Sequence, residues 1–176
     1  MKVTVIIPNY NGIEYLKECL KSLKAQTFKD FTVIVVDNCS TDGSPEYIKK
    51  YYPEIRLFEM DKNYGFSVAV NKGIRKSRTP YVILLNNDTV VHKNYMNELY
   101  NHINSSKKIF SVSSRMISYY NRGIIDDAGD LYSVVGWAFQ QGIGQPVEKF
   151  DTPCRVFSAC AGAAIYRREV FKKIGL

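Results

Sequence analysis

The chain has 176 residues, 45% of them hydrophobic and 13% aromatic, which is enough to bury a core and argues against intrinsic disorder. Its 24 Lys and Arg residues against 17 Asp and Glu give a formal net charge of +7. This balance indicates either a solvated basic surface or contact with phosphates, acidic glycans or an anionic membrane. Because the basic residues are spread in ones and twos along the sequence, we expect no nucleic-acid partner.

Strands and helices are predicted to alternate along the first half of the chain. A β-branched run at 3–7, closed by Pro8, is typical of a buried strand, and apolar positions spaced by three and four predict a one-faced helix over 14–23. The elements predicted next are a strand at 32–36, a helix that begins at Ser44 and Pro45, a strand at 55–58, a helix at 66–75 and a strand at 81–85. This alternation predicts an α/β fold with a mostly parallel central sheet and helices on both faces.

The second half of the chain has weaker periodicity. It predicts a helix at 94–103, strands at 109–114 and 116–119, and loops with short strands over the Gly-rich stretch 123–144. A final strand at 155–160 and a helix at 166–174 are also predicted. Without an internal repeat or a Pro/Gly/Ser-rich linker, residues 1–176 are interpreted as a single domain.

Polar clusters follow several of the predicted strands, where the ligand site of an open parallel sheet lies. Each cluster alone is ordinary turn chemistry, but their joint occurrence indicates a site. The motifs GxGxxG and GxxxxGK[ST] are absent. The loop after 81–85 ends in a carboxylate and offers oxygens of the kind that a hard cation bridging a diphosphate requires. The clusters are Pro8 to Asn11, Asp37 to Asp42, Asn63 to Gly65 and Asn86 to Asp88.

These segments together resemble the family 2 glycosyltransferases, in particular rhamnosyltransferase-like members, whose single α/β nucleotide-binding domain is called GT-A. The resemblance covers essentially the whole chain in order. It is carried by VIIPNYN at 5–11, VVDNCSTDG at 35–43, NYGF at 63–66, NKG at 71–73 and LLNND at 84–88.

The resemblance implies roles for individual residues. Pro8, Tyr10 and Asn11 would line the nucleotide pocket, and Asp37 would hydrogen-bond the base or ribose. Asp88 matches the last acid of the family's DxD-like motif and would hold Mg or Mn against the diphosphate. Asn86 replaces the first acid, so metal affinity without nucleotide should be weak. The remaining residues expected at the donor site are Asn63, Gly65, Asn71, Asn86 and Asn87.

The activity implied by the resemblance is metal-dependent transfer of a sugar, with inversion, from a nucleoside-diphosphate donor to a glycan or lipid-linked acceptor in polysaccharide biosynthesis. The family places its general-base carboxylate a short way beyond a segment like 170–176, so we expect a C-terminally truncated domain that binds donor but transfers sugar poorly. No catalytic base is assigned. Asp126, Asp127 and Asp130 could substitute, or they are loop acids and acceptor contacts.

Several alternatives stay open. A sugar-phosphate nucleotidyltransferase would need a Gly-rich basic loop after the first strand, whereas 9–13 has one Gly and no basic residue. A non-catalytic nucleotide-binding domain would keep the fold without transfer. The small residues at 159–164 either pack against a helix or permit close approach of the donor sugar.

The cellular setting is predicted from what the chain lacks. No run approaches the 18 apolar residues of a membrane span, and the four cysteines form no CxxC pair, so reduced thiols are expected. We therefore expect a cytoplasmic location, with peripheral contact at the inner face of the cell membrane where the acceptor is lipid-linked.

Overall fold

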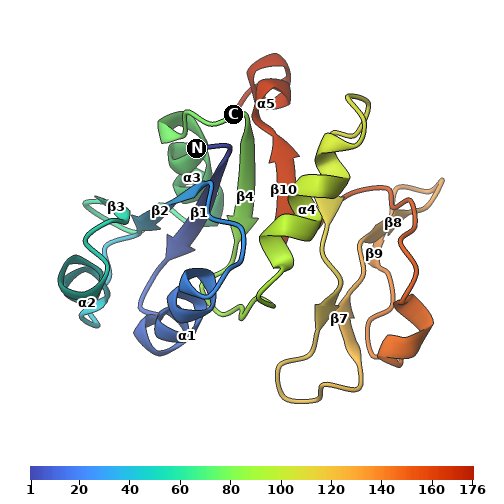
Figure 1. Cartoon of the computed structure of the whole chain (residues 1–176), viewed down its shortest axis with the longest axis horizontal. Coiled ribbons are helices and arrows are strands. Elements are labelled where there is room, and N and C mark those ends of the chain that lie inside the picture. Colours follow the sequence, from blue (N-terminus) through green and yellow to red (C-terminus); the bar gives the residue numbers. More distant parts are fainter.

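A six-stranded sheet forms the centre of the structure, a computed structural model that describes all residues from Met1 to Leu176 (Figure 1). The strand order is β3-β2-β1-β4-β10-β5. Strands β1 to β4 run parallel, and β10 lies antiparallel between β4 and β5. The predicted α/β fold with a mostly parallel sheet is thus confirmed. The strands are β1 Val3–Asn9, β2 Phe31–Asp37, β3 Arg56–Glu59, β4 Tyr81–Leu85, β5 Ser111–Ser113 and β10 Ala163–Arg167.

Helices cover both faces of the sheet, as predicted. Apolar side chains of α1, α2 and α4 pack on one face, and those of α3 and α5 on the other. Helix α3 approaches β1 so closely at Gly73 that a Cβ at this position would lie only 2.3 Å from Cγ2 of Ile6. The absence of a side chain at Gly73 therefore permits this packing. The helices are α1 Ile13–Lys24, α2 Ser44–Tyr51, α3 Phe66–Lys76, α4 Tyr95–Asn104 and α5 Arg168–Ile174. No α-helix has the length and apolar character needed to cross a membrane.

The segment between β5 and β10 lies beside the main sheet and forms two small sheets, β6-β7 and β8-β9 (Figure 1). This agrees with the prediction of loops and short strands for the Gly-rich stretch. The elements are β6 Met116–Ile117, β7 Ile125–Asp127, β8 Asp130–Tyr132, β9 Ala138–Gln140 and a short 3-10 helix at Val147–Phe150.

Three details of the prediction were wrong. The last strand is Ala163–Arg167 and not 155–160, and α5 begins at Arg168. The apolar side chain of Phe157 instead stacks on Tyr132, and Ser158 forms an isolated bridge with Asp130. Pro8 also does not end β1, which continues to Asn9.

The position of Pro8 in β1 has a physical reason. The ladder between β1 and β4 ends at Ile6, so Pro8 lies where only β2 still pairs with the strand. A residue without a backbone N–H is tolerated where a strand has an unpaired side. The strand can therefore carry Asn9 beyond the proline to the edge of the sheet.

Candidate functional site

The four polar clusters meet in one cavity of about 320 Å³ at the carboxyl ends of β1, β2 and β4. Parallel strands place the loops that follow them at the same edge, which explains the convergence. The cavity carries amide, backbone and aromatic groups and a single carboxylate. It is lined by Pro8, Asn9, Tyr10, Asn38, Asn63, Gly65, Phe66, Asn86, Asn87 and Asp88.

Asn9 connects the loops that form this cavity. It is 2% exposed, and its Nδ2 donates to Oδ1 of Asp37 at 2.8 Å and to Oγ of Ser40 at 3.2 Å. Its Oδ1 accepts from Nδ2 of Asn87 at 2.8 Å. One side chain at the end of β1 therefore joins the loop after β2 to the loop after β4.

Asp37 lies beneath the cavity and is 1% exposed. Besides Asn9, its carboxylate accepts from Oγ of Ser40 at 2.6 Å and from the backbone N–H of Ser40 at 2.8 Å. Buried carboxylates require such partners, and Asp37 is accordingly held in place by the loop that it begins. Its direct contact with a base or ribose stays a prediction.

The loop after β2 is tied to the loop after β1. The backbone N–H of Asn11 donates to Oγ of Ser40 at 2.9 Å, and Oδ1 of Asn11 accepts from the backbone N–H of Thr41 at 2.8 Å. Asn11 has a φ of 46°, a left-handed conformation that Asn tolerates better than most residues. In this arrangement Asn11 supports the pocket loops and is not among the residues that line the cavity.

The segment Asn63 to Gly65, directly before α3, contributes two of the residues that line the cavity. Oδ1 of Asn63 accepts from the backbone N–H of Gly65 at 2.8 Å, and the φ of 83° and ψ of 173° at Gly65 require glycine. Nδ2 of Asn38 donates to the carbonyl of Gly65 at 3.2 Å. Oδ1 of Asn38 is buried and has no hydrogen-bond partner.

The loop after β4 brings Asn86, Asn87 and Asp88 into the cavity. The backbone N–H of Asn86 donates to the carbonyl of Gly162 at 2.8 Å. Asn87 passes directly over Gly12, where a Cβ would lie 2.3 Å from Nδ2 of Asn87. Glycine at position 12 is thus needed for the Asn87–Asn9 hydrogen bond.

Asp88 is exposed and is the only carboxylate among the lining residues, which include no Lys, Arg or His. No group of three or more His, Cys, Asp or Glu side chains in the protein could hold a metal ion by itself. A divalent cation held by one carboxylate, amide oxygens, water and substrate phosphates matches the habit of Mg²⁺. The lining residues therefore fit a cation that arrives together with a diphosphate.

Most of the predicted site residues come together in the cavity, namely Pro8, Tyr10, Asn63, Gly65, Asn86, Asn87 and Asp88. Asn11, Asp37 and Asn71 do not line it. Sequence reasoning missed Asn9, Asn38 and Phe66 as individual site residues. Asn9 and Asn38 belong to clusters that it identified, and Phe66 directly follows one of them, so position after a strand was the available signal.

The acids of the Gly-rich stretch lie outside the cavity lining. Asp127 is 1% exposed and accepts from the backbone N–H of Gly129 at 2.6 Å and from Nε2 of Gln140 at 3.2 Å. Asp130 accepts from Oγ of Ser158 at 2.7 Å. Gly162, in contrast, lies beside Asn86, and its neighbours Ala163 and Ala164 are buried in the sheet. Close approach of a donor sugar to this segment stays a prediction.

Comparison with known proteins identifies the family. Residues 4–175 match glycosyl transferase family 2, so the chain belongs to this family. Over 106 residues it is 36% identical to the poly(ribitol-phosphate) beta-N-acetylglucosaminyltransferase TarP of Staphylococcus aureus, an alignment that covers 57% of this chain and 32% of TarP.

Solved structures share the fold at low sequence identity. One is S. aureus TarS 1-349 in complex with UDP-GlcNAc, with a TM-score of 0.72, 22% identity, and coverage of 99% of this chain and 47% of the other. Another is the mannosyltransferase PcManGT from Pyrobaculum calidifontis in complex with GDP-Man and Mn²⁺, with a TM-score of 0.71, 19% identity, and coverage of 99% and 46%. The chain thus spans less than half the length of each of these proteins.

Proposed function

We propose that the cavity binds a nucleoside-diphosphate sugar together with Mg²⁺ or Mn²⁺, and that the protein transfers the sugar with inversion to a glycan or lipid-linked acceptor. The charge of the cavity carries this proposal. A diphosphate is anionic, yet the lining offers one carboxylate and no cationic side chain. A diphosphate in this cavity needs a cation that offsets the negative charge of its phosphates and of the Asp88 carboxylate. Asp88 is the residue able to hold this cation.

The chain's own residues would bind and orient the donor. Tyr10, 51% exposed, and Phe66, 47% exposed, offer aromatic surface to the base and ribose. Asn86 and Asn87 present amide groups to hydroxyls or phosphate oxygens. The unpartnered Oδ1 of Asn38 costs on the order of 1–3 kcal/mol, which an N–H group of the donor base could recover if the loop shifts.

The bound cation would neutralise the charge that develops on the departing diphosphate. Asp88 would hold it in place, and the Asn87–Asn9–Asp37 hydrogen bonds would keep the loop after β4 rigid. No carboxylate other than Asp88 lines the cavity. We therefore propose that the base that activates the acceptor comes from outside residues 1–176, and that this chain alone binds donor but transfers sugar poorly.

The cellular role is part of the same proposal. TarP is a poly(ribitol-phosphate) glycosyltransferase by name, which supports a role in bacterial polysaccharide or teichoic acid assembly. The net charge of +7 supports contact with a phosphate-bearing acceptor or with the inner face of the cell membrane, from a cytoplasmic location.

Calorimetric titration tests the donor site. The purified chain is titrated with uridine, thymidine and guanosine diphosphates, with and without Mn²⁺, beside Asp88→Asn and the exposed control Glu98→Gln. Removal of Asp88 should weaken metal-dependent binding by about tenfold or more, because contacts to charged groups contribute roughly 1.5–3 kcal/mol. The control should bind like the wild type. Absence of binding across the whole panel would contradict the proposal.

A further inference from the structure

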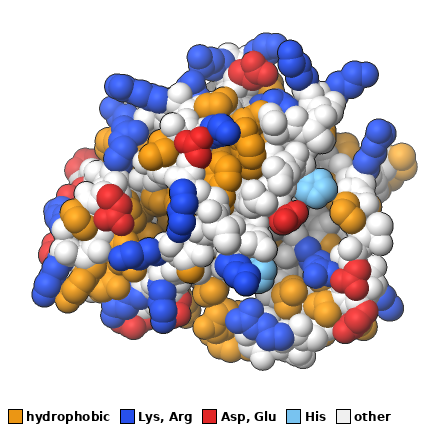
Figure 2. Space-filling view, viewed as in Figure 1, with side chains coloured by type: hydrophobic (Ala, Val, Ile, Leu, Met, Phe, Trp, Pro, Cys, Tyr) orange, Lys and Arg blue, Asp and Glu red, His pale blue; other side chains and the backbone are white.

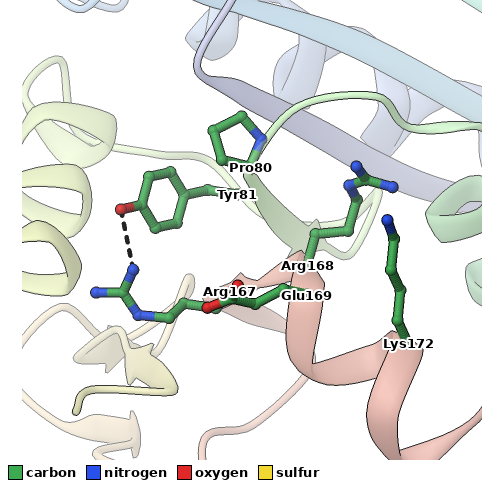
Figure 3. Close-up of a pocket in the computed structure, with 6 residues that line it drawn as sticks. All are labelled: Pro80, Tyr81, Arg167, Arg168, Glu169 and Lys172. Atoms are coloured by element: carbon green, nitrogen blue, oxygen red, sulfur yellow. Dashed lines mark hydrogen bonds between the residues drawn. The ribbon is translucent and has the colours of Figure 1, made fainter. Parts of the chain in front are cut away.

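A second cavity, of about 200 Å³, lies at the opposite edge of the sheet, where β4 begins and β10 runs into α5. Figure 3 shows the side chains that surround it. Tyr81 and Leu85 are the two ends of β4, so the strand separates this cavity from the proposed donor site. The cavity is lined by Pro80, Tyr81, Arg167, Arg168, Glu169 and Lys172.

Arg167 contributes a half-buried positive charge with no carboxylate within ion-pair distance. Its guanidinium donates to the carbonyls of Ile109 at 2.6 Å, Ser106 at 2.7 Å and Ile103 at 2.5 Å, and to the hydroxyl of Tyr81 at 3.1 Å. All of these acceptors are neutral, and no ion pair of the protein includes Arg167. Four of its five N–H groups are paired, and its charge still acts on the cavity.

Arg168 and Lys172 keep free donors. Nε of Arg168 donates to the carbonyl of Thr79 at 2.7 Å, which leaves both Nη groups without a protein partner. Lys172 forms no ion pair, and its spacing of four from Arg168 places both on one face of α5. Figure 3 shows the ends of these two side chains converging, while Glu169, the one acid of the cavity, extends away from them toward the side of Arg167.

The surrounding edge is also basic. Figure 2 shows Lys and Arg side chains along the upper rim of the molecule, where α5 and the start of β4 lie in Figure 1. Basic residues are common in the last turn of a helix, which accounts for Lys76 in α3 and is also the position of Lys172 in α5. Arg78, Lys107 and Lys108 lie in loops outside any helix, so helix ends do not account for them.

We propose that this cavity binds a phosphate group, with the Nη groups of Arg168 and the Nζ of Lys172 as donors and Arg167 adding attraction. A guanidinium fork beside an ammonium is suited to phosphate oxygens, and charge-assisted hydrogen bonds are the stronger kind. A cavity of about 200 Å³ admits a phosphate group but is smaller than the roughly 300–1,000 Å³ typical of sites for larger ligands.

The phosphate could belong to a lipid headgroup or to a soluble phosphorylated compound. The proposal does not depend on donor binding, because the two cavities lie at opposite ends of β4. A lipid phosphate in this cavity would direct the donor pocket away from the bilayer. In that orientation, an acceptor would reach the donor pocket from the side of the domain that faces away from the membrane.

The test uses the chain labelled with ¹⁵N. Inorganic phosphate is titrated at constant ionic strength while amide signals of α5 are followed by NMR. Sedimentation with vesicles of phosphatidylcholine, with and without phosphatidylglycerol, forms the second arm. The variants are Arg168→Gln with Lys172→Gln, and Lys172→Gln alone in case the pair disturbs folding. Lys107→Gln with Lys108→Gln is the control, because it removes the same charge from the same edge outside the cavity.

We expect saturable shifts at Arg168 to Lys172, with phosphate affinity about tenfold lower in the cavity variant and less than about twofold lower in the control. Loss of phosphatidylglycerol binding in the cavity variant alone would assign the phosphate to a lipid, and a response to inorganic phosphate alone would assign it to a soluble compound. Equal losses in both variants, or no saturable response in either arm, would overturn the proposal. Nucleotide titration of the same variants reports the donor site separately.

Discussion

Replacement of Asn9 by alanine would test whether the hydrogen bonds beneath the donor pocket stabilise the fold. The substitution removes the contacts to Asp37, Ser40 and Asn87. A hydrogen bond to a charged group contributes roughly 1.5–3 kcal/mol and a neutral one about 1 kcal/mol. Water can replace part of the contact at the half-buried Asn87, so we expect a loss of about 3 kcal/mol of unfolding free energy.

This loss is large beside the roughly 5–15 kcal/mol that stabilises a typical domain. Urea unfolding followed by circular dichroism measures it, and the melting temperature should fall by about 6–12 °C. The matched control is Asn101→Ala, an exposed position on α4, which should change stability by no more than about 0.5 kcal/mol. If Asn9→Ala were as stable as this control, the hydrogen bonds of Asn9 to Asp37, Ser40 and Asn87 would not stabilise the fold.

Further substitutions and reagents test other parts of the structure. Partial burial raises the pKa of Asp42, but hydrogen bonds from Ser44 and from the backbone N–H groups of Ile13 and Ser44 outweigh it and lower the pKa from its usual 3.8. A carboxylate whose native pKa lies below its unfolded pKa stabilises the fold fully at pH values above the unfolded pKa. This stabilisation is lost as the pH falls through the native pKa. Asp42→Asn should therefore cost about 1 kcal/mol in urea unfolding at pH 7 and flatten the decline in stability below about pH 4. An unchanged acid limb would contradict this role. Gly12→Ala should displace Asn87, with an overpacking cost of about 1–3 kcal/mol and weaker nucleotide binding in calorimetry; normal binding would show that Asn87 is not needed in place. Burial raises the pKa of the Cys19 thiol to about 12, so Ellman's reagent should label exposed Cys39 and Cys154 in the native protein and Cys19 only after unfolding. Rapid native labelling of Cys19 in a variant that lacks the other cysteines would be inconsistent with the packing of α1.

The sequence was sufficient to predict the parallel part of the sheet. Buried parallel strands such as β4 are continuous apolar runs, and helices such as α1 show a clear apolar face, so both leave strong local signals. The convergence of the polar clusters followed from the same reasoning, because strand direction places their loops at one edge.

The antiparallel strand β10 left a weaker signal. Its residues Ala163 and Ala164 are buried but small, and small residues do not mark a strand locally. The run at 155–160 contains the strand formers Val156 and Phe157, but the Phe157 side chain stacks on Tyr132 outside the main sheet. Contacts between residues distant in the sequence therefore determine which of the two runs forms the last strand.

The proposed donor pocket was also predictable only in part. Asp88 could be predicted because a carboxylate after a buried strand is conspicuous. The partners of Asn9 and Asp37 could not, because their hydrogen bonds join residues 28 positions apart in the chain, and those of Asn9 and Asn87 join residues 78 apart. The asymmetry between a proposed donor pocket without Lys, Arg or His and a basic cavity at the other edge also depends on the fold.

The most direct test of the donor site uses the paramagnetism of Mn²⁺, whose broadening of NMR signals falls steeply with distance. Amide spectra of the ¹⁵N-labelled chain are recorded with Mn²⁺ and a nucleoside diphosphate that binds in calorimetry, and repeated with Asp88→Asn. The proposed function predicts selective loss of the signals of Gly12, Gly65, Asn87 and Asp88 only when metal and nucleotide are both present, and little broadening around Arg168. Broadening centred on any other part of the chain, or unchanged by Asp88→Asn, would contradict it.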